Sequence, residues 1–445
     1  MLRLYAFFGS TLVISSFLGA SAEAQRAPIQ TKARIVRPAK VMTSAPLAQL
    51  AALAGPEPRA REVQEINPLG TPPLPLGLSK PEAWIDPLRR DPIELAPAPA
   101  PYRSFEGVNN RNSVVPPDTN GDVGKDHYVQ WVNLSLQIFD KTTGASLLGP
   151  VNGNTLWAGF GGICQSNNNG DPVVLYDPLA DRWIFSQFGL GANGHQCIAI
   201  SATPDPLGAY HLYDYIVTPN GTNDYPKFGI WDDAYLYMAN EFAPGFVGAL
   251  IGGFDRQKLL VGDPSALFVF FGLEPGLAGA THFAPEPANL EGMTPPPAGR
   301  PALFVQPIDT AVWGGPIDRY NLWEVEFDFA VPANSTAVLT QLSAGVPSFN
   351  SFVCASFNAC IPQGGTANRL DSLAQFTMYR PVYRNFGTHE VLLVNHTVNA
   401  GGGVAGIRWT EIRDPFGAPT VHQTGTHSPN ASHRWMGSIA MDGDG

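Results

Sequence analysis

Short apolar runs that each end in an aromatic or aliphatic residue followed by Asp recur along this chain. Residues 137–140, 174–177 and 252–255 follow the pattern, and a turn and another apolar run come within a few residues of each. The runs are rich in β-branched and aromatic residues, and Asp, Gly, Pro and Asn supply the turns. The pattern predicts β-hairpins and a body of antiparallel sheet.

Runs of this kind continue from residue 105 to residue 445, and no stretch shows helical periodicity over the length of a globular helix. Four-stranded blades repeated around an axis accommodate such a length at roughly 40 to 50 residues per blade. The sequence therefore predicts an all-β fold, a β-propeller of about six or seven blades, with tandem β-sandwiches as the alternative. Residues 435–441 predict a strand and 442–445 the turn after it, so we expect a truncated last blade.

The beginning of the chain has the pattern of an export signal. A basic residue, an apolar stretch and small residues at alternate positions predict a signal peptide over residues 1–24, and the stretch is shorter than the roughly 20 residues of a spanning helix. Residues 25–104 are rich in Pro and Ala, which predicts an extended linker or pro-segment with a short helix around 47–53. We therefore expect a secreted protein, extracellular, periplasmic or on the cell surface, without a membrane span.

Four cysteines in an exported chain predict two disulfides, because oxidising compartments sustain them. Cys354 and Cys360 enclose five residues, and a local bridge there leaves Cys164 to pair with Cys197. A zinc site is disfavoured because the cysteines lack paired close spacings.

The charge is unevenly distributed. The whole chain carries −11, but residues 25–100 hold 10 basic and 7 acidic residues, which leaves 16 basic and 30 acidic residues from residue 101 onward. An acidic body disfavours nucleic acid and anionic lipid surfaces as partners, since both require clustered positive charge. Cations are better partners for this acidic body. The sequence does not indicate an oligomeric state.

Oxygen-bearing side chains alternate in residues 118–126. Asp118, Asn120, Asp122 and Asp126 stand at positions one, three, five and nine, an order that can fold hard ligands around one Ca²⁺. Position six is not Gly, as an EF-hand requires, and strand residues follow at once. The alternative is an Asx-rich turn whose side chains bond their own backbone. The segment is a candidate structural calcium loop, and the Asx-rich turn is an equally open interpretation.

Three further patterns have structural explanations. The glycine spacing in residues 189–194 matches the dinucleotide-binding motif Gly-x-Gly-x-x-Gly. That motif needs a helix after the glycines to bind the pyrophosphate, but strand residues follow here, so we expect a hairpin loop. The acidic residues of 322–329 alternate with apolar ones, which is typical of a half-buried strand with a solvated face. Histidines at 422, 427 and 433 are irregularly spaced in a polar segment. The chain has no Gly-x-Ser-x-Gly elbow, zinc-protease helix or phosphate loop.

Several local motifs, taken as a set, resemble a family of large secreted bacterial proteins with propeller-like bodies. The motifs lie at 116–124, 127–133, 170–177 with 181–183, 224–229 and 434–442. The resemblance covers residues 116–445 and implies export and a propeller-like body; it implies no reaction. In such proteins the chain continues past the position of Gly445. The repeated Ser-x-Asp-x-Gly-x-Thr-Trp turn of sialidase-like propellers is absent.

Two functions remain on this evidence. The first is an exported binding or adhesion module, for carbohydrate or another surface polymer, with exposed aromatic residues contacting sugar rings and calcium ordering their support. The second is a glycan-degrading hydrolase or lyase with carboxylates around the central channel, because propellers host both. Two nearby carboxylates in a deep site, one with a raised pKa, would favour the enzyme.

Overall fold

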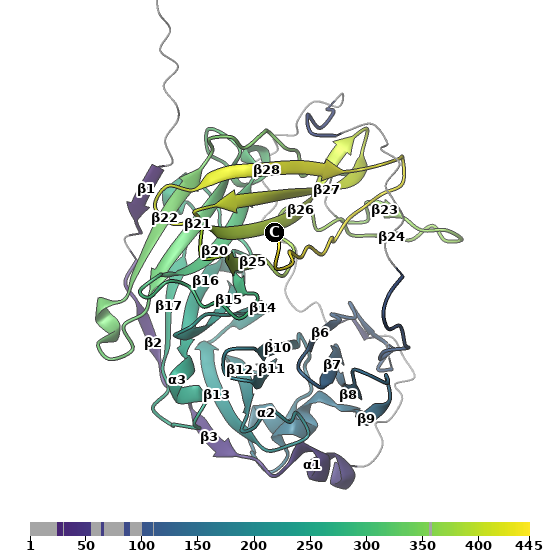
Figure 1. Cartoon of the computed structure of the whole chain (residues 1–445), viewed down its shortest axis with the longest axis vertical. Helices are drawn as coiled ribbons and strands as arrows, with labels where there is room; N and C mark the ends of the chain where they lie inside the picture. Colours follow the sequence, from purple (N-terminus) through teal and green to yellow (C-terminus); the bar gives the residue numbers. More distant parts are fainter. Residues whose placement is uncertain are drawn as a thin grey trace, which may run out of the picture.

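The computed structural model describes residues 25–29, 31–54, 64–65, 84–89, 100–109, 111–355 and 358–445. The predicted signal peptide, 1–24, lies outside these residues. Five sheets, antiparallel except for one parallel strand pair, stand around a common centre, with their innermost strands next to one another (Figure 1). No helix of the described chain is long and apolar enough to cross a membrane.

Each sheet is one blade, numbered here in chain order. The strands of blade 1 are β6 (Asn120–Val123), β7 (His127–Val132), β8 (Ser135–Asp140) and β9 (Ser146–Asn152). Those of blade 2 are β10 (Val173–Asp177), β11 (Arg182–Leu190), β12 (Gly194–Ser201) and β13 (Tyr210–Thr218). Those of blade 3 are β14 (Thr222–Ile230), β15 (Ala234–Phe242), β16 (Phe246–Asp255) and β17 (Phe268–Leu273).

The innermost strands of blades 4 and 5 come from one short segment of the chain. The strands of blade 4 are β18 (Glu286–Pro287), β20 (Ala302–Ile308), β21 (Arg319–Glu326) and β22 (Thr336–Leu342). Those of blade 5 are β19 (Asn289–Leu290), β25 (Val382–Asn385), β26 (Glu390–Gly401), β27 (Val404–Arg413) and β28 (Thr420–His427). β19 runs parallel to β25, so one short segment supplies the inner edge of both blades.

Short elements fill the connections between these strands. The helical ones are α1 (Leu47–Ala54), α2 (Ile163–Ser166), α3 (Arg256–Leu259), α4 (Thr310–Trp313), η1 (Gly153–Trp157), η2 (Leu277–Gly279) and η3 (Pro332–Asn334). Two small pairs, one parallel and one antiparallel, are β4 (Gln64–Glu65) with β5 (Val114–Val115) and β23 (Ile361–Pro362) with β24 (Arg369–Leu370).

The blades pack face to face, so their central strands are buried on both sides. Every residue of β15 is buried, and continuous apolar clusters fill the spaces between neighbouring blades. Aromatic residues dominate these layers, as where the ring of Phe254 stacks on that of Phe268 at 4.2 Å between centroids. The sandwich alternative is therefore excluded, because the sheets surround one axis (Figure 1).

The predicted propeller is confirmed, but the predicted count of six or seven blades is wrong. There are five blades, because long connections such as 343–381 consume residues that the estimate assigned to strands. Residues 435–441 also form no strand. They lie against blade 5, where Ile439 and Met441 pack on Val382, Val391 and Leu393.

Three short stretches of the proline-rich leader form strands that are bound to the propeller. β1 (Gln25–Pro28) pairs with β22, β2 (Arg34–Val36) with β17, and β3 (Lys40–Thr43) with β13. α1 then lies against blade 1. This N-terminal arm, residues 25–54, thus extends blades 4, 3 and 2 by one outer strand each, in reverse chain order (purple in Figure 1).

A second leader segment, residues 84–89, anchors on blade 5. Arg408 donates from Nη2 to both carboxylate oxygens of Asp86, at 2.8 Å each, and both side chains are buried. Trp84 donates from Nε1 to the carbonyl of Asn399 at 3.2 Å. The leader therefore contacts all five blades.

Both predicted disulfides are confirmed. Cys164 joins Cys197, and Cys354 joins Cys360. The first ties α2 to β12, and the second closes a loop between blades 4 and 5.

Candidate functional site at the propeller axis

Four carboxyl groups stand where successive blades begin. Asp118 precedes β6, Asp171 precedes β10, Asp224 lies in β14, and Glu286 opens β18. Each is the entry of an innermost strand, so the fold brings together residues that are far apart in the chain. Lys227, also in β14, interacts electrostatically with all four.

Unusual backbone angles accompany these residues. Asp118, Asp171 and Tyr225 have φ values of 40°, 45° and 58°, in the left-handed region that side chains rarely adopt. The pairing of β14 with β15 is also irregular between Asp224 and Lys227. Such strain persists only where the surrounding structure enforces it, and it clusters at functional sites.

Asp118 and Asp171 share a hydrogen bond between their side chains. Burial, then the charge of Asp171, raises the pKa of Asp118 to about 8, against the opposing charge of Lys227. Burial also raises the pKa of Asp171, whereas Lys227, the hydrogen bond from Asp118 and the backbone N–H of Tyr225 favour its charged form. The two carboxyl groups therefore titrate as a pair that holds a proton more tightly than an isolated aspartate does.

The other two carboxyl groups differ in their surroundings. Burial and the charge of Asp171 raise the pKa of Asp224 to about 7, while Lys227 and the N–H of Tyr225 oppose the shift. Glu286 is fully buried, burial raises its pKa to about 8, and neither of its carboxylate oxygens has a hydrogen-bond partner. Lys227 holds its Nζ 3.6 Å from the ring centroid of Tyr225.

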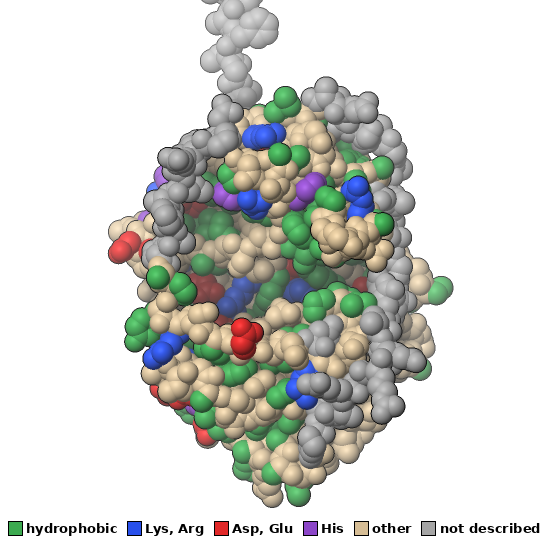
Figure 2. Space-filling view, turned by 90° about the vertical axis from the view of Figure 1, so that its right-hand side faces the viewer, with side chains coloured by type: hydrophobic (Ala, Val, Ile, Leu, Met, Phe, Trp, Pro, Cys, Tyr) green, Lys and Arg blue, Asp and Glu red, His purple; other side chains and the backbone are tan. Residues whose placement is uncertain are grey.

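The three aspartates remain partly exposed, although burial is the largest cause of their pKa shifts. Solvent therefore reaches these groups although dense protein surrounds them. Space-filling views show a hollow on the side where blade 5 lies above blade 1, with acidic and basic side chains inside it (Figure 2). The axis thus combines desolvation with access, which is what acid and base catalysis requires.

An ion pair near the axis links the last blade to the first. Arg380, just before β25, donates from Nη1 and Nη2 to the two carboxylate oxygens of Asp122 at 2.9 and 3.1 Å. Its Nε lies 3.6 Å from Glu291. Asp122 also accepts from the backbone N–H of Tyr176 at 3.0 Å, so β6 is held on both sides.

The four residues predicted to bind calcium have separate contacts. Asp118 belongs to the axial group, Asn120 accepts from the backbone N–H of Val174 at 2.9 Å, Asp122 binds Arg380, and Asp126 is exposed in the turn before β7. Their carboxylates do not form a group of three within reach of one ion. Calcium binding remains a prediction.

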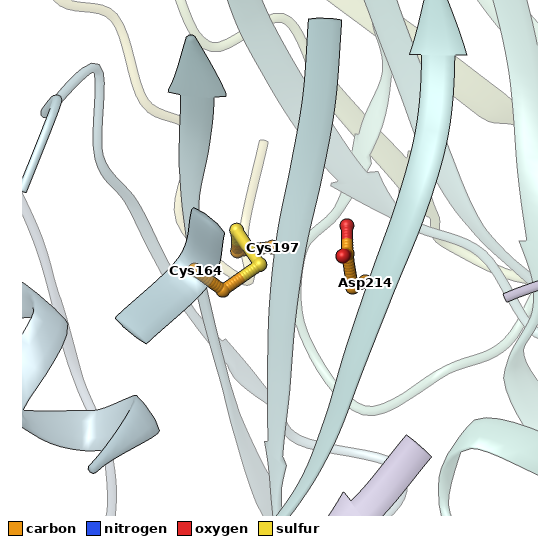
Figure 3. A group of neighbouring side chains, drawn as sticks. All are labelled: Cys164, Cys197 and Asp214. Atoms are coloured by element: carbon orange, nitrogen blue, oxygen red, sulfur yellow. A yellow bond between two sulfur atoms is a disulfide. The ribbon is translucent and has the colours of Figure 1, made fainter. Parts of the chain in front are cut away.

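Within the described ranges, one group of three potential metal ligands has all its ligand atoms within 4.8 Å: Cys164, Cys197 and Asp214 (Figure 3). Its two sulfur atoms are joined as a disulfide, and Asp214 pairs with His195 at 2.7 Å. The group is therefore not a thiolate metal site. Among the described residues, the axial carboxyl groups do not form such a group of three.

The structure also places the glycine-rich segment, the three histidines and the alternating acidic strand. Residues 189–194 connect β11 and β12 as the expected hairpin. The three histidines do not gather, since His422 and His427 are exposed on β28 and His433 accepts from the N–H of Ala405. The expected solvated face of β21 is wrong for Glu324, which is buried against Arg26 of the arm and Thr340.

Sequence reasoning missed Asp171, Asp224 and Glu286. One signal was available: Asp118, Asp171 and Asp224 are 53 residues apart in each step, and a proline lies within two residues of each. Four of the segments that carry the family resemblance also meet here, at 116–124, 127–133, 170–177 and 224–229.

Comparisons with known proteins give no family for this chain. No protein-family model matches, and no curated protein matches. Among solved structures, a thermostable family-43 glycoside hydrolase is 11% identical, covers 72% of this chain and 96% of its own, and has a TM-score of 0.35. A family-43 endo-arabinanase from Bacillus licheniformis is 10% identical with coverages of 68% and 96% and a TM-score of 0.31. An ACO/RPE65 chimera is 12% identical with coverages of 71% and 73% and a TM-score of 0.30. These TM-scores are too low to indicate a function for this chain.

Proposed function

We propose that this protein is an exported hydrolase that cleaves glycosidic bonds with carboxyl groups at the propeller axis. The observation that carries the proposal is the set of desolvated aspartates with pKa values raised toward neutrality. Glycoside hydrolysis uses a protonated carboxyl group to assist the leaving oxygen and an ionised one as base or nucleophile. No other acid, base or nucleophile motif competes with these groups in the sequence.

The environment of each carboxyl group suggests its role. Asp118 keeps its proton near pH 7 and is the general acid, with Asp171 as its hydrogen-bond acceptor. Asp224 is the base or nucleophile, because it is partly exposed and Lys227 and a backbone N–H favour its ionised form. Glu286 is fully buried and does not touch substrate; it adds to the field that holds protons at the axis.

A binding module alone accounts less well for this site. Gathering four carboxyl groups around one lysine in dense protein lowers stability, and flat contacts with sugar rings do not need it. Protein interiors keep such arrangements where they serve chemistry. The raised pKa values of Asp118 and Asp224 support the enzyme over the binding module, and the carbohydrate ligand is common to both proposals.

The test is hydrolysis of a panel of neutral and acidic polysaccharides, measured as release of reducing ends. We expect activity in the wild type and a loss of about 100-fold or more in kcat for Asp118→Asn and Asp224→Asn. Asp205→Asn is the control, because this aspartate is exposed in the turn between β12 and β13 and belongs to neither the axial group nor the calcium loop. No release from any polysaccharide, or full activity in both axial variants, would refute the proposal.

A structural calcium ion held by Asp118, Asn120, Asp122 and Asp126 is an alternative proposal for this segment, supported by the order of these residues in the sequence. A carboxyl group that binds the ion is ionised, so calcium at Asp118 would exclude this residue as the general acid. Calcium binding to the native state would raise the melting temperature by mass action. We expect a lower Tm in excess chelator than in millimolar Ca²⁺, and a smaller difference in Asp126→Ala. Equal Tm values in both buffers would remove the calcium ion from the account.

A further inference from the structure

We propose that blade 5 carries a peptide-recognition site, and that residues 84–89 of the leader are its bound ligand. These residues read Trp-Ile-Asp-Pro-Leu-Arg, and proline-rich sequence precedes and follows them. The ligand class is an extended peptide in which an aspartate stands two residues after a tryptophan and starts a turn. The inference concerns binding and does not depend on the proposed hydrolase function.

The centre of the site is the buried guanidinium of Arg408. Its Nε donates to Oγ1 of Thr426 at 2.9 Å and its Nη1 to the carbonyl of Pro347 at 3.2 Å, so the body of the propeller orients it. Its Nη2 donates to both carboxylate oxygens of Asp86. Among the described residues, no other carboxylate lies within 4.0 Å of the Arg408 nitrogens. Blade 5 therefore holds a buried cation whose partner charge comes from the leader.

The backbone beside Arg408 is shaped by blade 5 itself. Oδ1 of Asn399 accepts from the N–H groups of Gly401 and Gly403 at 2.9 and 3.1 Å, which fixes the turn between β26 and β27. Gly401 has a φ of 130°, and a Cβ atom there would lie 3.6 Å from the carbonyl oxygen of Trp84. The leader thus passes directly over this glycine. None of the turn bonds involves the leader, so blade 5 can present the site without it.

The leader segment binds through a few specific groups. The indole Nε1 of Trp84 donates to the carbonyl of Asn399 at 3.2 Å. Asp86 is buried, whereas the neighbouring Ile85 is 70% exposed. Oδ1 of Asp86 also accepts from the N–H of Leu88 at 2.8 Å, so the aspartate stabilises its own turn. A short segment anchored by one aromatic and one charged side chain has the form of a docked peptide.

The alternative is a contact that forms only because the chain holds the leader beside blade 5. A covalent connection supplies an effective concentration in the millimolar range, so even a weak contact would then form. A ligand and a covalent tie differ in one measurable property. Only a ligand binds when it is supplied as a separate molecule.

The test supplies the peptide to the full chain carrying Asp86→Ala. The probe is a synthetic peptide with the sequence of residues 84–89 and blocked ends, and calorimetry measures its binding. We expect a Kd of about 100 µM or lower. A peptide carrying Asp86→Asn should bind at least about tenfold more weakly, because the charge-assisted bonds to Arg408 are lost. The wild-type chain is the control: its own leader occupies the site, so it should bind the probe at least about tenfold more weakly than the variant.

Asp86→Ala leaves Arg408 buried without its carboxylate, which lowers stability. If this chain does not fold, the isosteric Asp86→Asn takes its place in the same titration, and its Tm should rise with peptide concentration. Two results would overturn the inference: no binding at about 1 mM peptide, or equal binding by the wild type and the variant. Either result would show that residues 84–89 are held by the covalent chain alone.

Discussion

At the scale of single residues, the axis concentrates features that lower stability. Asp118, Asp171 and Tyr225 hold left-handed backbone angles, and the carboxyl groups beside them are desolvated. Elsewhere, buried charges are paired at short distance, as Arg256 is with Asp177 at 2.7 Å. At the axis, by contrast, Glu286 is buried and neither of its carboxylate oxygens has a hydrogen-bond partner. Such an unfavourable arrangement indicates a functional site.

The loss of stability caused by a buried carboxyl group can be measured at Glu286. Its pKa is raised from 4.5 to about 8, so between these values the native state binds a proton that the unfolded chain has released. The stabilisation is therefore complete below pH 4.5 and is lost as pH rises toward 8. We expect Glu286→Gln to raise Tm by about 2 °C or more at pH 8 and to leave it nearly unchanged at pH 4.5, by thermal unfolding.

The control for this measurement is Glu326→Gln, which changes an exposed glutamate at the end of β21 in blade 4, the blade that Glu286 opens. It should shift Tm little at either pH. A Glu286→Gln variant whose Tm differs from the wild type by the same amount at both pH values would show that burial does not hold the proton on Glu286.

At the scale of elements, the pattern of apolar residues and the turn residues correctly predicted the structures that depend on local sequence. The hairpins around 140, 177 and 255 follow from residues adjacent in the chain, and the two disulfides follow from spacing. The strands of the arm could not be predicted, because a three-residue strand such as β2 is specified by the edge of β17 that it meets. The axial carboxyl groups were missed for a similar reason: the packing of blade 2 on blade 1, and not a local sequence pattern, brings Asp171 to Asp118.

The two disulfides differ in the length of chain that they close. Cys164 and Cys197 are 33 residues apart, and Cys354 and Cys360 are 6 apart. Loop-closure entropy gives about 3 to 4 kcal/mol for the longer loop and about 2 kcal/mol for the shorter. We expect the Cys164→Ala, Cys197→Ala double variant to lose more unfolding free energy in urea than the Cys354→Ala, Cys360→Ala variant. The reverse order would show that packing, and not chain entropy, dominates at these sites.

At the scale of the whole molecule, closure of the ring depends on contacts between distant parts of the chain. Arg380 joins blade 5 to Asp122 of blade 1, and the N-terminal arm runs around the outside across blades 4, 3, 2 and 1. The arm carries five basic and no acidic residues between 25 and 54, whereas the body is acidic. Its Arg26 reaches Glu324 at 2.9 Å, so charge supports the strand pairing.

Removal of residues 25–43 tests whether the arm is part of the folded unit. The deletion would leave the outer edges of β22, β17 and β13 without partners, and unpaired edges invite association between molecules. We expect a lower Tm and growth of oligomers over time, measured by thermal unfolding and light scattering. Arg34→Gln is the control, because it removes the 3.7 Å ion pair with Glu241 and keeps the strand, so it should lower Tm much less than the deletion. High salt should weaken the charge contribution and leave the backbone pairing intact, which separates the two terms. A deleted chain that stays monomeric with unchanged Tm would instead mean that the five blades are complete without the arm, and that the arm is free to be removed after export.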